Sequence, residues 1–346
     1  MINIHFAGDD LGQSRNRLAI SCGVVGDGNT HPYQALADYG EDRWQPSAFE
    51  DADVVVYALP YYDREDTRRV AAAARDAGLP CIFFRANDDP TPSNPLHGVV
   101  YRTSLYRSRL TPRELAMPGF TDDLLSECGG EAVPRDKQER GTVGFCGYVG
   151  SRRERILQHS LGLLLGNRDK AIGLSLRLKA LKHLRASTLV DTNFIERPKL
   201  WGDALTGTAE WDAQRRAQVR REYLQNIVES DYCLSLRGKG NYSFRLYEIF
   251  AMGGIPLFID TDCVLPFEDE IDWKQHCCWV DESDLKRADE IVAQFHADRS
   301  TDDLGQLRID NRQLWEDYLS DRAIYTRVLQ RALQSSENSA ESDRAR

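Results

Sequence analysis

One stretch in the last third of the chain constrains the fold more than any other part of the sequence. Residues 231–269 read DYCLSLRGKGNYSFRLYEIFAMGGIPLFIDTDCVLPFED. An apolar run at 232–236 predicts a buried strand, and a loop at 237–241 with two glycines and two cations follows it. A helix is expected from about 244 to 252, ended by two glycines, and a second apolar strand from 255 to 259. This strand–loop–helix–strand unit indicates a doubly wound α/β sheet, which binds ligands at the carboxyl ends of its strands.

The loop in the middle of this stretch is suited to binding an anion. Backbone N–H groups at the start of a helix point outward and carry partial positive charge. Asn241 or Ser243 is the expected N-cap of the helix. Arg237, Lys239 and Arg245 add full positive charges beside it. Taken alone, the pattern fits a phosphate-binding loop and a solvated basic turn about equally well.

Glu248 extends this pattern by one helical turn. It follows Arg245 by three residues, so both side chains project from one face of the expected helix. A carboxylate at this place could accept hydrogen bonds from the hydroxyls of a ribose. The residues themselves therefore leave open a site for a nucleotide or phosphorylated ligand, and a surface ion pair between Arg245 and Glu248.

The longer segment Arg237–Trp273 resembles the exostosin-type glycosyltransferases, glycosyltransferase family 47. The resemblance rests on a Ser–x–Arg–x–x–Glu helix, a strand entered through Gly–x–Pro, and a later Leu-Pro-Phe…Ile-Asp-Trp segment. Here these residues are Ser243/Arg245/Glu248, Gly254-Ile255-Pro256, Leu265-Pro266-Phe267 and Ile271-Asp272-Trp273. The resemblance implies an α/β chain of GT-B fold, in which two Rossmann-like doubly wound domains face each other across a cleft. It also implies that the C-terminal domain holds most of the nucleotide sugar.

The rest of the chain suggests how these domains are divided. Alternating strands and helices predict an N-terminal Rossmann-like domain on the acceptor side at 1–135, and a polar linker ends at about 140. The nucleotide-sugar-binding domain is expected at 141–305, with helices at 174–184 and 211–229 and a loop at 191–194. A C-terminal helix at 306–333 is a candidate to cross back to the N-terminal domain, and a polar tail at 334–346 is predicted to be disordered.

The resemblance also assigns residues to the donor site. The first strand of the second domain, at 142–148, ends in Gly147-Tyr148, and Gly147 would let a donor approach the backbone closely. An ordinary strand-to-helix turn explains these two residues as well, and only the family context favours binding. The expected donor-binding residues are Arg237, Lys239, Asn241, Ser243, Arg245, Glu248, Gly147 and Tyr148.

A glycosyl transfer also requires a base for the acceptor hydroxyl and stabilisation of the leaving diphosphate. Arg245 is the candidate for the diphosphate. The candidate bases follow strands of the N-terminal domain: Asp88, Asp89, Asp9 and Asp10. Many retaining GT-B enzymes carry two glutamates across this loop and helix, but Gly240 stands where the first would fall. That departure agrees with the inverting chemistry that the resemblance implies.

Composition excludes several classes of protein. A formal net charge of −10 argues against general nucleic-acid binding, which needs a basic footprint. No run of residues approaches the length of a membrane span, and the N-terminal segment lacks the features of a signal peptide. The eight cysteines form no C-x-x-C pair and are expected to be reduced thiols. These features predict a cytoplasmic protein; two arginine clusters could meet an anionic lipid surface or an acidic glycan, which leaves room for peripheral contact with the membrane.

The expected activity is the transfer of a sugar from a nucleotide-diphosphate sugar, a UDP-sugar by preference, to a glycan or lipid-linked glycan in polysaccharide biosynthesis. No cofactor and no essential metal are expected, although Asp260-Thr261-Asp262 matches the Asp–x–Asp metal signature of the other glycosyltransferase fold, GT-A. A non-catalytic binder of sugar nucleotides or phosphoglycans with the same fold is the alternative. A hydrolase or epimerase acting on a sugar nucleotide is also open, but no G-x-G-x-x-G follows the first strand, which argues against the epimerase.

Overall fold

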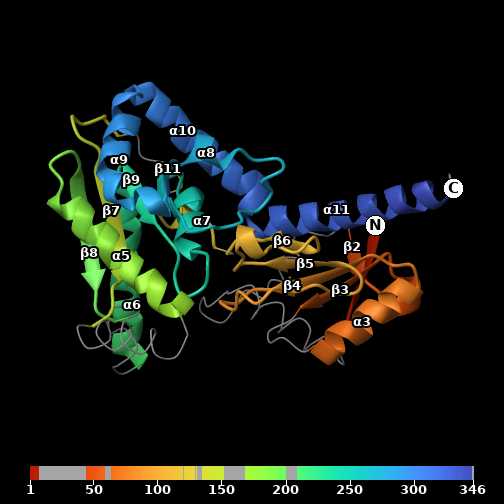
Figure 1. Ribbon diagram of the computed structural model, residues 1–346. Coiled ribbons are helices and arrows are strands. Elements are labelled where there is room, and N and C mark those ends of the chain that lie inside the picture. Colours follow the sequence, from red (N-terminus) through yellow and green to blue (C-terminus); the bar gives the residue numbers. More distant parts are fainter. Residues whose placement is uncertain are drawn as a thin grey trace. The chain divides into compact units, whose positions relative to one another are not determined.

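The computed structural model describes residues 1–7, 44–58, 64–119, 121–128, 130, 135–151, 168–199 and 209–344 (Figure 1). The chain forms two compact units. Unit 1 comprises Met1–Thr121, Cys263–Phe267 and Asp317–Arg346, and unit 2 comprises Asp122–Asp262 and Glu268–Glu316. Both ends of the chain therefore belong to unit 1.

Unit 1 is built on a six-stranded parallel sheet with the order β2-β1-β3-β4-β5-β6. The strands are β1 Ile2–Phe6, β2 Trp44–Pro46, β3 Val54–Ala58, β4 Cys81–Arg85, β5 Val99–Arg102 and β6 Glu114–Ala116. The longer helices are α3 Arg64–Asp76 and α11 Asp321–Arg344, and two short 3-10 helices are η1 Phe49–Asp51 and η2 Arg107–Arg109.

Both faces of this sheet are covered, which explains why its strands are continuously apolar. Successive side chains of a strand point to opposite faces. Phe83 of β4 packs in a cluster with Val70 and Ala74 of α3, whereas the next residue, Phe84, meets the ring of Tyr325 of α11 edge-on at 5.6 Å. Helices α3 and α11 accordingly lie on opposite faces of the sheet (Figure 1).

Unit 2 is built on a five-stranded parallel sheet with the order β11-β10-β9-β7-β8. The strands are β7 Thr142–Tyr148, β8 Asp191–Arg197, β9 Tyr232–Ser235, β10 Pro256–Asp260 and β11 Cys278–Asp281. The α-helices are α5 Arg168–Ala186, α6 Ala209–Val228, α7 Phe244–Ala251, α8 Trp273–His276, α9 Ala288–Ala297 and α10 Thr301–Leu314. Unit 2 also contains two 3-10 helices, η3 Ser126–Cys128 and η5 Glu282–Arg287. A π-helical turn at Trp315–Leu319 follows α10, where the chain passes from unit 2 to unit 1.

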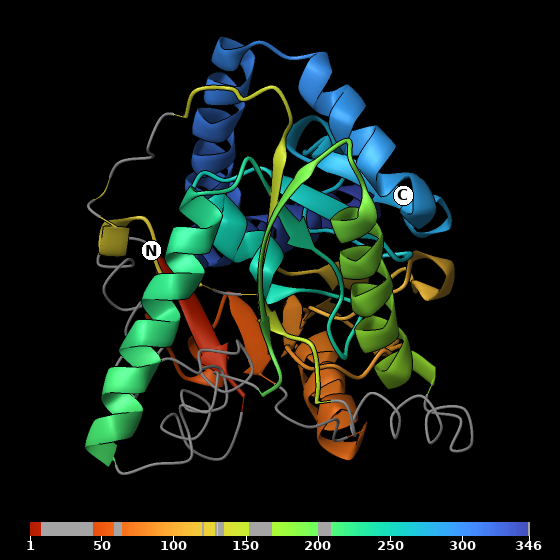
Figure 2. The ribbon, with the colours of Figure 1, turned by 90° about the vertical axis from the view of Figure 1, so that its left-hand side faces the viewer.

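The helices of unit 2 also divide between the two faces of the sheet. Apolar residues of α5 and α9, such as Leu181 and Val292, join Val143 and Leu257 in one buried cluster. Helix α6 lies on the other side of β7 and β8 from α5 (Figure 2) and is tied to α7 by a hydrogen bond from Tyr223. The result is a layered α/β unit.

Each of the two sheets has a point at which the strand order reverses. In unit 2 the chain starts at β7, adds β8 on one side, and then adds β9, β10 and β11 on the other. Strand order therefore reverses between β7 and β9, and doubly wound sheets bind ligands at that switch point, beyond the carboxyl ends of the strands. In unit 1 the reversal lies between β1 and β3.

The predicted α/β class with two parallel, doubly wound sheets is confirmed. The stretch that anchors the sequence argument forms β9, α7 and β10 within one or two residues of the expected bounds, and Gly253 adopts the left-handed conformation (φ 65°) that ends the helix. The loop predicted at 191–194 is wrong, because these residues begin β8, which pairs with β7 along its whole length. Strand β8 lies at the edge of the sheet, and most of its residues are only partly buried, so no apolar run marks it in the sequence.

The C-terminal part of the chain differs in detail from the expected single helix. Helices α10 and α11 are separated by the π-helical turn at Trp315–Leu319, and α11 runs through Arg344, including 334–344, for which the sequence predicts a disordered tail. The domain boundaries at 135, 141, 305 and 333 stay predictions. In the described part of the chain, no helix is both long and apolar enough to cross a membrane.

Candidate functional site

The switch point of unit 2 brings together two of the predicted donor-site segments. Strand β7 pairs with β8 as far as Tyr148, whereas its pairing with β9 is at Val143 and Gly144. The end of β7 therefore runs past its partner on the β9 side. The chain leaving β9 passes through the predicted loop at 237–243 and enters α7, so this loop and Gly147-Tyr148 lie at the same edge of the sheet.

Arg245 of α7 reaches across to the end of β7. Its Nη2 donates a hydrogen bond of 2.5 Å to the carbonyl oxygen of Cys146. Its guanidinium carbon lies 4.4 Å from the ring centroid of Phe145 and 5.4 Å from that of Tyr223. A Cβ on Gly147 would come within 2.4 Å of Nη2, so glycine at this position lets the guanidinium in. The structure thus brings together the predicted residues Arg245 and Gly147.

The loop after β9 is held by its own backbone and by Asn241. The N–H of Gly238 donates to the carbonyl of Tyr242 at 3.0 Å, and Arg237 is almost fully buried, with Nη2 donating to the carbonyl of Lys239 at 3.4 Å. The buried Asn241 side chain donates to the carbonyl of Asp262 at 3.2 Å and accepts from the Thr261 hydroxyl at 2.7 Å. Asn241 therefore fixes the loop to the segment after β10.

Ser243 is the N-cap residue of α7, as expected, but neither it nor Asn241 supplies a capping side chain. The Ser243 side chain makes no capping hydrogen bond, and Asn241 is engaged elsewhere. The prediction of a side-chain cap is wrong. The start of α7 retains the electrostatic character that favours an anion.

Glu248 is held by α6 instead of by Arg245. The hydroxyl of Tyr223 donates a hydrogen bond of 2.5 Å to Oε2 of Glu248, and Nη1 of Arg220 lies 3.8 Å from Oε1. Burial, together with the neighbouring Glu248, raises the pKa of Tyr223, so the hydroxyl stays protonated and remains a donor. Arg245 and Glu248, both described residues, do not form the surface ion pair, and Arg220 takes that place.

Arg177 of α5 joins the same site, and no sequence pattern singled it out. Its Nη1 donates to the carbonyl of Tyr148 at 2.7 Å and its Nη2 to the carbonyl of Arg237 at 3.3 Å. Burial, and the nearby charge of Arg245, lower the pKa of Arg177 to about 10. The guanidinium is therefore still charged at neutral pH. Its contacts are to backbone oxygens far away in sequence, and such contacts leave no local pattern.

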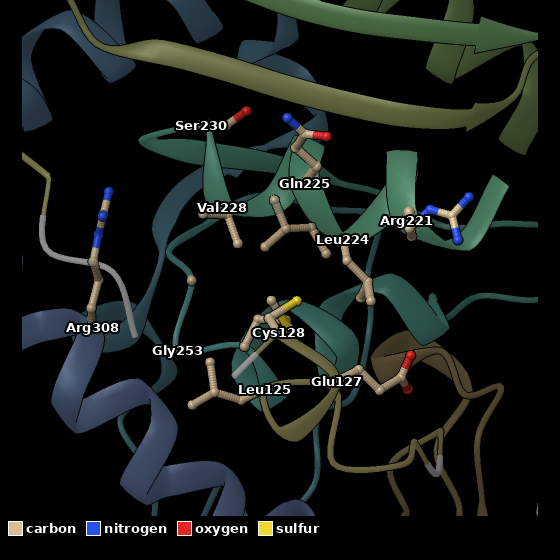
Figure 3. A pocket seen from close by; sticks show the side chains of 13 residues that line it. Leu125, Glu127, Cys128, Arg221, Leu224, Gln225, Val228, Ser230, Gly253 and Arg308 are labelled. Carbon is tan, nitrogen blue, oxygen red and sulfur yellow. The ribbon is translucent and has the colours of Figure 1, made fainter. Parts of the chain in front are cut away.

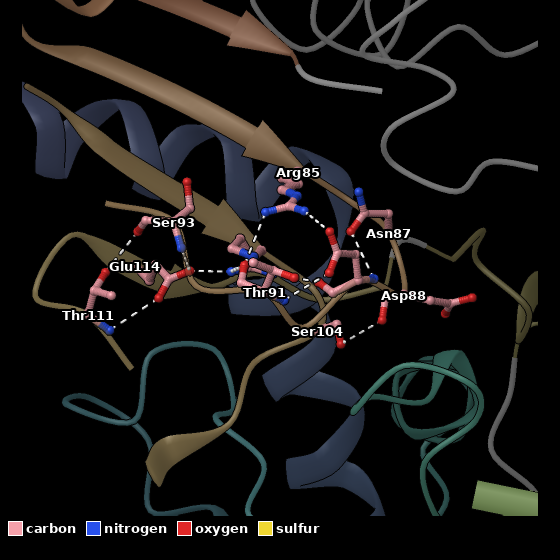
Figure 4. Close-up of polar contacts among 10 residues, drawn as sticks. Arg85, Asn87, Asp88, Thr91, Ser93, Ser104, Thr111 and Glu114 are labelled. Atoms are coloured by element: carbon pink, nitrogen blue, oxygen red, sulfur yellow. Dashed lines mark hydrogen bonds and ion pairs between the residues drawn. The ribbon is translucent and has the colours of Figure 1, made fainter. Parts of the chain in front are cut away.

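Unit 1 contains a buried polar network at the carboxyl ends of β4 and β5 (Figure 4). Arg102 forms an ion pair with Glu114, and both side chains are 1% exposed. Arg85, equally buried, pairs with Asp89, and both arginines also donate to the carbonyl of Thr91, at 3.2 Å from Arg85 and 2.7 Å from Arg102. The network fixes the loop that carries the candidate bases.

The two aspartates of that loop have different surroundings. Burial tends to raise the pKa of Asp89, but hydrogen bonds from Thr91 and the charges of Arg85 and Arg102 bring it below its ordinary value. These contacts favour a structural role, because a depressed pKa makes a weak base. The carboxylate of Asp88 points away from the network (Figure 4), and its backbone carbonyl accepts from Ser104 at 3.4 Å. Asp9 and Asp10 lie outside the described residues.

A separate pocket of about 360 Å³ lies in unit 2, between α6 and the turn that follows α7 (Figure 3). Its wall is mostly apolar, with Leu125, Leu224 and Met252, and Arg308 and Arg221 stand at its sides. None of the predicted donor-site residues lines it.

Within the described residues, no group of three or more His, Cys, Asp or Glu side chains could hold a metal ion.

Comparison with known proteins decides the family of this segment. Residues 188–295 match the family described as the exostosin GT47 domain. This stretch is similar to exostosin-type domains. The predicted resemblance to exostosin-like glycosyltransferases is thereby confirmed, and Tyr223, the Arg237 loop, Arg245 and Glu248 all fall within the exostosin domain.

Curated relatives support the same assignment. Exostosin-1 of Drosophila melanogaster is 35% identical over 117 residues, which are 33% of this chain and 15% of the fly protein. A probable glucuronosyltransferase of Oryza sativa subsp. japonica is 38% identical over 76 residues, 22% of this chain and 18% of the rice protein. Exostosin-1a of Danio rerio is 30% identical over 112 residues, 32% of this chain and 15% of the fish protein. The chain thus covers less than a fifth of the length of each of these relatives.

Among solved structures, an ABC domain in complex with L-Trp from Streptococcus pneumonia aligns over 87% of this chain and 86% of that chain. The TM-score is 0.18 at 9% identity, so the alignment carries no argument about the fold.

Gly147, Tyr148 and Arg177 lie before residue 188 and therefore outside the exostosin domain match. The assignment of the β7 end and of α5 to the site rests on the geometry of the sheet alone.

Proposed function

We propose that this protein is a glycosyltransferase that uses a nucleotide-diphosphate sugar, and that it binds the donor at the switch point of unit 2. One observation carries the proposal. Two charged residues of the exostosin segment, Arg245 and Glu248, lie on the helix that starts at this switch point, and Arg245 contacts the end of β7 directly. Parallel doubly wound sheets bind nucleotides at this place.

The proposed roles follow from charge and geometry. Arg245 and the amide-rich start of α7 would stabilise the negative charge that develops on the leaving diphosphate. Glu248, oriented by the Tyr223 hydroxyl at 2.5 Å, would accept hydrogen bonds from the ribose. Arg237 and Lys239 would add positive charge to the loop, and their charges would also favour capture of an anionic donor.

Unit 1 is proposed to supply the base that takes the proton from the acceptor hydroxyl. Asp88 is the better candidate of its loop because Asp89 is engaged by Arg85 and the backbone of Thr91. Asp9 and Asp10, which follow β1 in the sequence, stay candidates. Inversion at the anomeric carbon and independence from metal are further parts of the proposal, and an NMR time course of the product anomer and activity in the presence of EDTA test them.

The donor and acceptor belong to the same proposal. One of the relatives is named a probable glucuronosyltransferase, so UDP-glucuronic acid is the first donor to try. A glycan or a lipid-linked glycan is the proposed acceptor. A cytoplasmic location, with peripheral contact to the membrane, is proposed from the composition of the chain.

A thermal-shift screen of nucleotide sugars, followed by turnover of the best donor, tests the function. A donor at about 100 times its dissociation constant stabilises the folded protein by about 2.7 kcal/mol, which is a readily measured rise in the midpoint. A rise with one donor class, and release of its nucleotide when acceptor glycans are added, is the expected result. No rise with any nucleotide sugar contradicts the proposal, and a rise without turnover on any acceptor or water indicates a non-catalytic binder.

A further inference from the structure

Arg177 connects the two strand ends that form the switch point of unit 2. One amino group of its guanidinium donates to the carbonyl of Tyr148, at the end of β7, and the other to the carbonyl of Arg237, just beyond β9. Its helix is held close to this loop, because a Cβ on Gly173 would lie only 1.9 Å from the carbonyl oxygen of Gly238. Helix α5 therefore fixes the Arg177 guanidinium at the place where the donor is proposed to bind.

Within the described part of the chain, the charged neighbour that most affects the pKa of Arg177 is another arginine, Arg245. The guanidinium carbon of Arg177 is 5.9 Å from the ring centroid of Phe145, and that of Arg245 is 4.4 Å from the same centroid. The hydrogen bonds of Arg177 go to backbone carbonyls, whereas Arg245 contacts the Cys146 carbonyl and also the Tyr223 hydroxyl, which itself donates to Glu248. The Nε atom of each arginine is buried without a partner. Among the described residues, neither arginine forms an ion pair with a carboxylate.

Two more deeply buried arginines of the described residues are each neutralised by a carboxylate. Arg102 pairs with Glu114, and Arg197 pairs with Glu222 at 2.7 Å. In contrast, the neighbouring guanidinium groups of Arg177 and Arg245 form no ion pair with a carboxylate among the described residues. Removing like charges from water without a counter-charge destabilises a protein, and charged groups that are perturbed in this way cluster at functional sites.

We propose that Arg177 is a second anion-binding residue of this site, and that Arg177 and Arg245 together bind the diphosphate of the donor. The inference rests on the proposed function and extends it to a residue outside the exostosin domain match. Each guanidinium carries five N–H donors, of which the carbonyl contacts use only a part. The remaining donors and the two positive charges match a group that carries negative charge on two adjacent phosphates.

The test compares UDP with UMP, which differ only in the number of phosphates, and adds inorganic pyrophosphate as the diphosphate without a nucleoside. Affinities for UDP, UMP and inorganic pyrophosphate are measured by isothermal titration calorimetry with the wild-type protein and with Arg177→Gln and Arg177→Lys. Lys179→Gln is the matched control, because Lys179 is exposed on the same helix and the substitution removes the same charge. The unliganded thermal midpoint of each variant reports whether the fold is retained.

The expected loss is specific for the diphosphate. Arg177→Gln weakens UDP binding by about 10- to 100-fold, as expected for a lost charge-assisted hydrogen bond, and lowers the ratio of UDP to UMP affinity by about tenfold or more. Arg177→Lys restores part of that ratio because it retains the charge, and Lys179→Gln leaves the ratio unchanged. If Arg177→Gln does not fold, the comparison is made with Arg177→Lys, whose ratio of UDP to UMP affinity is expected to lie below that of the wild-type protein.

Two results overturn the inference while leaving the proposed function intact. One is a wild-type protein that binds UDP and an Arg177→Gln variant that binds it equally well. The other is an equal loss of affinity for UDP and UMP, which would mean that Arg177 only braces the strand ends. A wild-type protein that binds neither UDP nor pyrophosphate overturns both the inference and the proposed function.

Discussion

Gly173 offers a test in which helix propensity and tertiary contact predict opposite outcomes. It lies inside α5, where replacing glycine with alanine normally stabilises a helix by about 1 kcal/mol. The structure places an added Cβ at 1.9 Å from the carbonyl oxygen of Gly238 and 3.0 Å from its carbonyl carbon. Both are backbone atoms of the loop that is proposed to bind the diphosphate, so no side chain can move aside to relieve the contact.

The size of the effect follows from that distance. Contacts of a Cβ with another heavy atom below 3.0 Å essentially do not occur, so α5 or the loop must shift by about 1 Å. Forced overpacking of this kind costs about 1–3 kcal/mol, which equals or exceeds the gain from propensity. A displacement of about 1 Å in a binding loop can lower activity by about 100-fold. Gly173→Ala is therefore expected to be no more stable than the wild type and to bind UDP far more weakly.

The matched control is Gly305→Ala in α10. Gly305 also lies inside a helix, but nothing stands within 4 Å of an added Cβ. This variant should gain the full propensity term of about 1 kcal/mol, or about 2–4 °C in the thermal midpoint, with unchanged UDP affinity. Differential scanning fluorimetry and calorimetric UDP titration measure both variants. The account is refuted if Gly173→Ala behaves like Gly305→Ala in both assays.

The remaining predictions concern hydrogen bonds of the site. Tyr223→Phe removes the donor to Glu248 and should weaken binding of the nucleotide by about 1 kcal/mol or more, measured by UDP titration; unchanged affinity would show that Glu248 needs no orientation. Asp88→Asn should abolish most turnover without changing UDP affinity, whereas undiminished turnover would move the search for the base elsewhere. Asp89→Asn should destabilise the protein by about 1 kcal/mol at pH 7, after discounting for its exposed carboxylate, because Arg85 loses its partner. Since the pKa of Asp89 is lowered on folding, this difference should persist above the ordinary value of 3.8 and vanish as the pH falls below it, and a difference that is independent of pH would contradict the pairing.

The local elements of the site could be predicted from the sequence because their signals are short-range. The apolar runs, the glycine pair and the Ser–x–Arg–x–x–Glu spacing located β9, α7 and β10 and placed Arg245 and Glu248 on one helix. The position of Gly147 near that helix followed only from the family resemblance. The structure gives its physical reason, which is the space that the Arg245 guanidinium needs beside β7.

The partners of site residues that lie far away in the sequence could not be predicted from the sequence. Arg177 contacts two carbonyl groups, 29 and 60 residues away, and a carbonyl is present at every position of any chain. The sequence leaves open a surface pair of Glu248 with its helical neighbour Arg245, but Tyr223 and Arg220 on another helix engage Glu248 instead. The sequence predicts a loop at 191–194, where edge strand β8 begins, because only the last residue of this strand is fully buried and no continuous apolar run marks it. In each case tertiary contact decided between options that local pattern left equal.

A crystal structure of the protein with UDP tests the central claim most directly. The account predicts electron density for the diphosphate at the switch point of unit 2, between the end of β7 and the Arg237 loop, within hydrogen-bonding distance of Arg245 and with the ribose near Glu248. Density for UDP in the pocket between α6 and the turn after α7, or only on unit 1, would contradict the account.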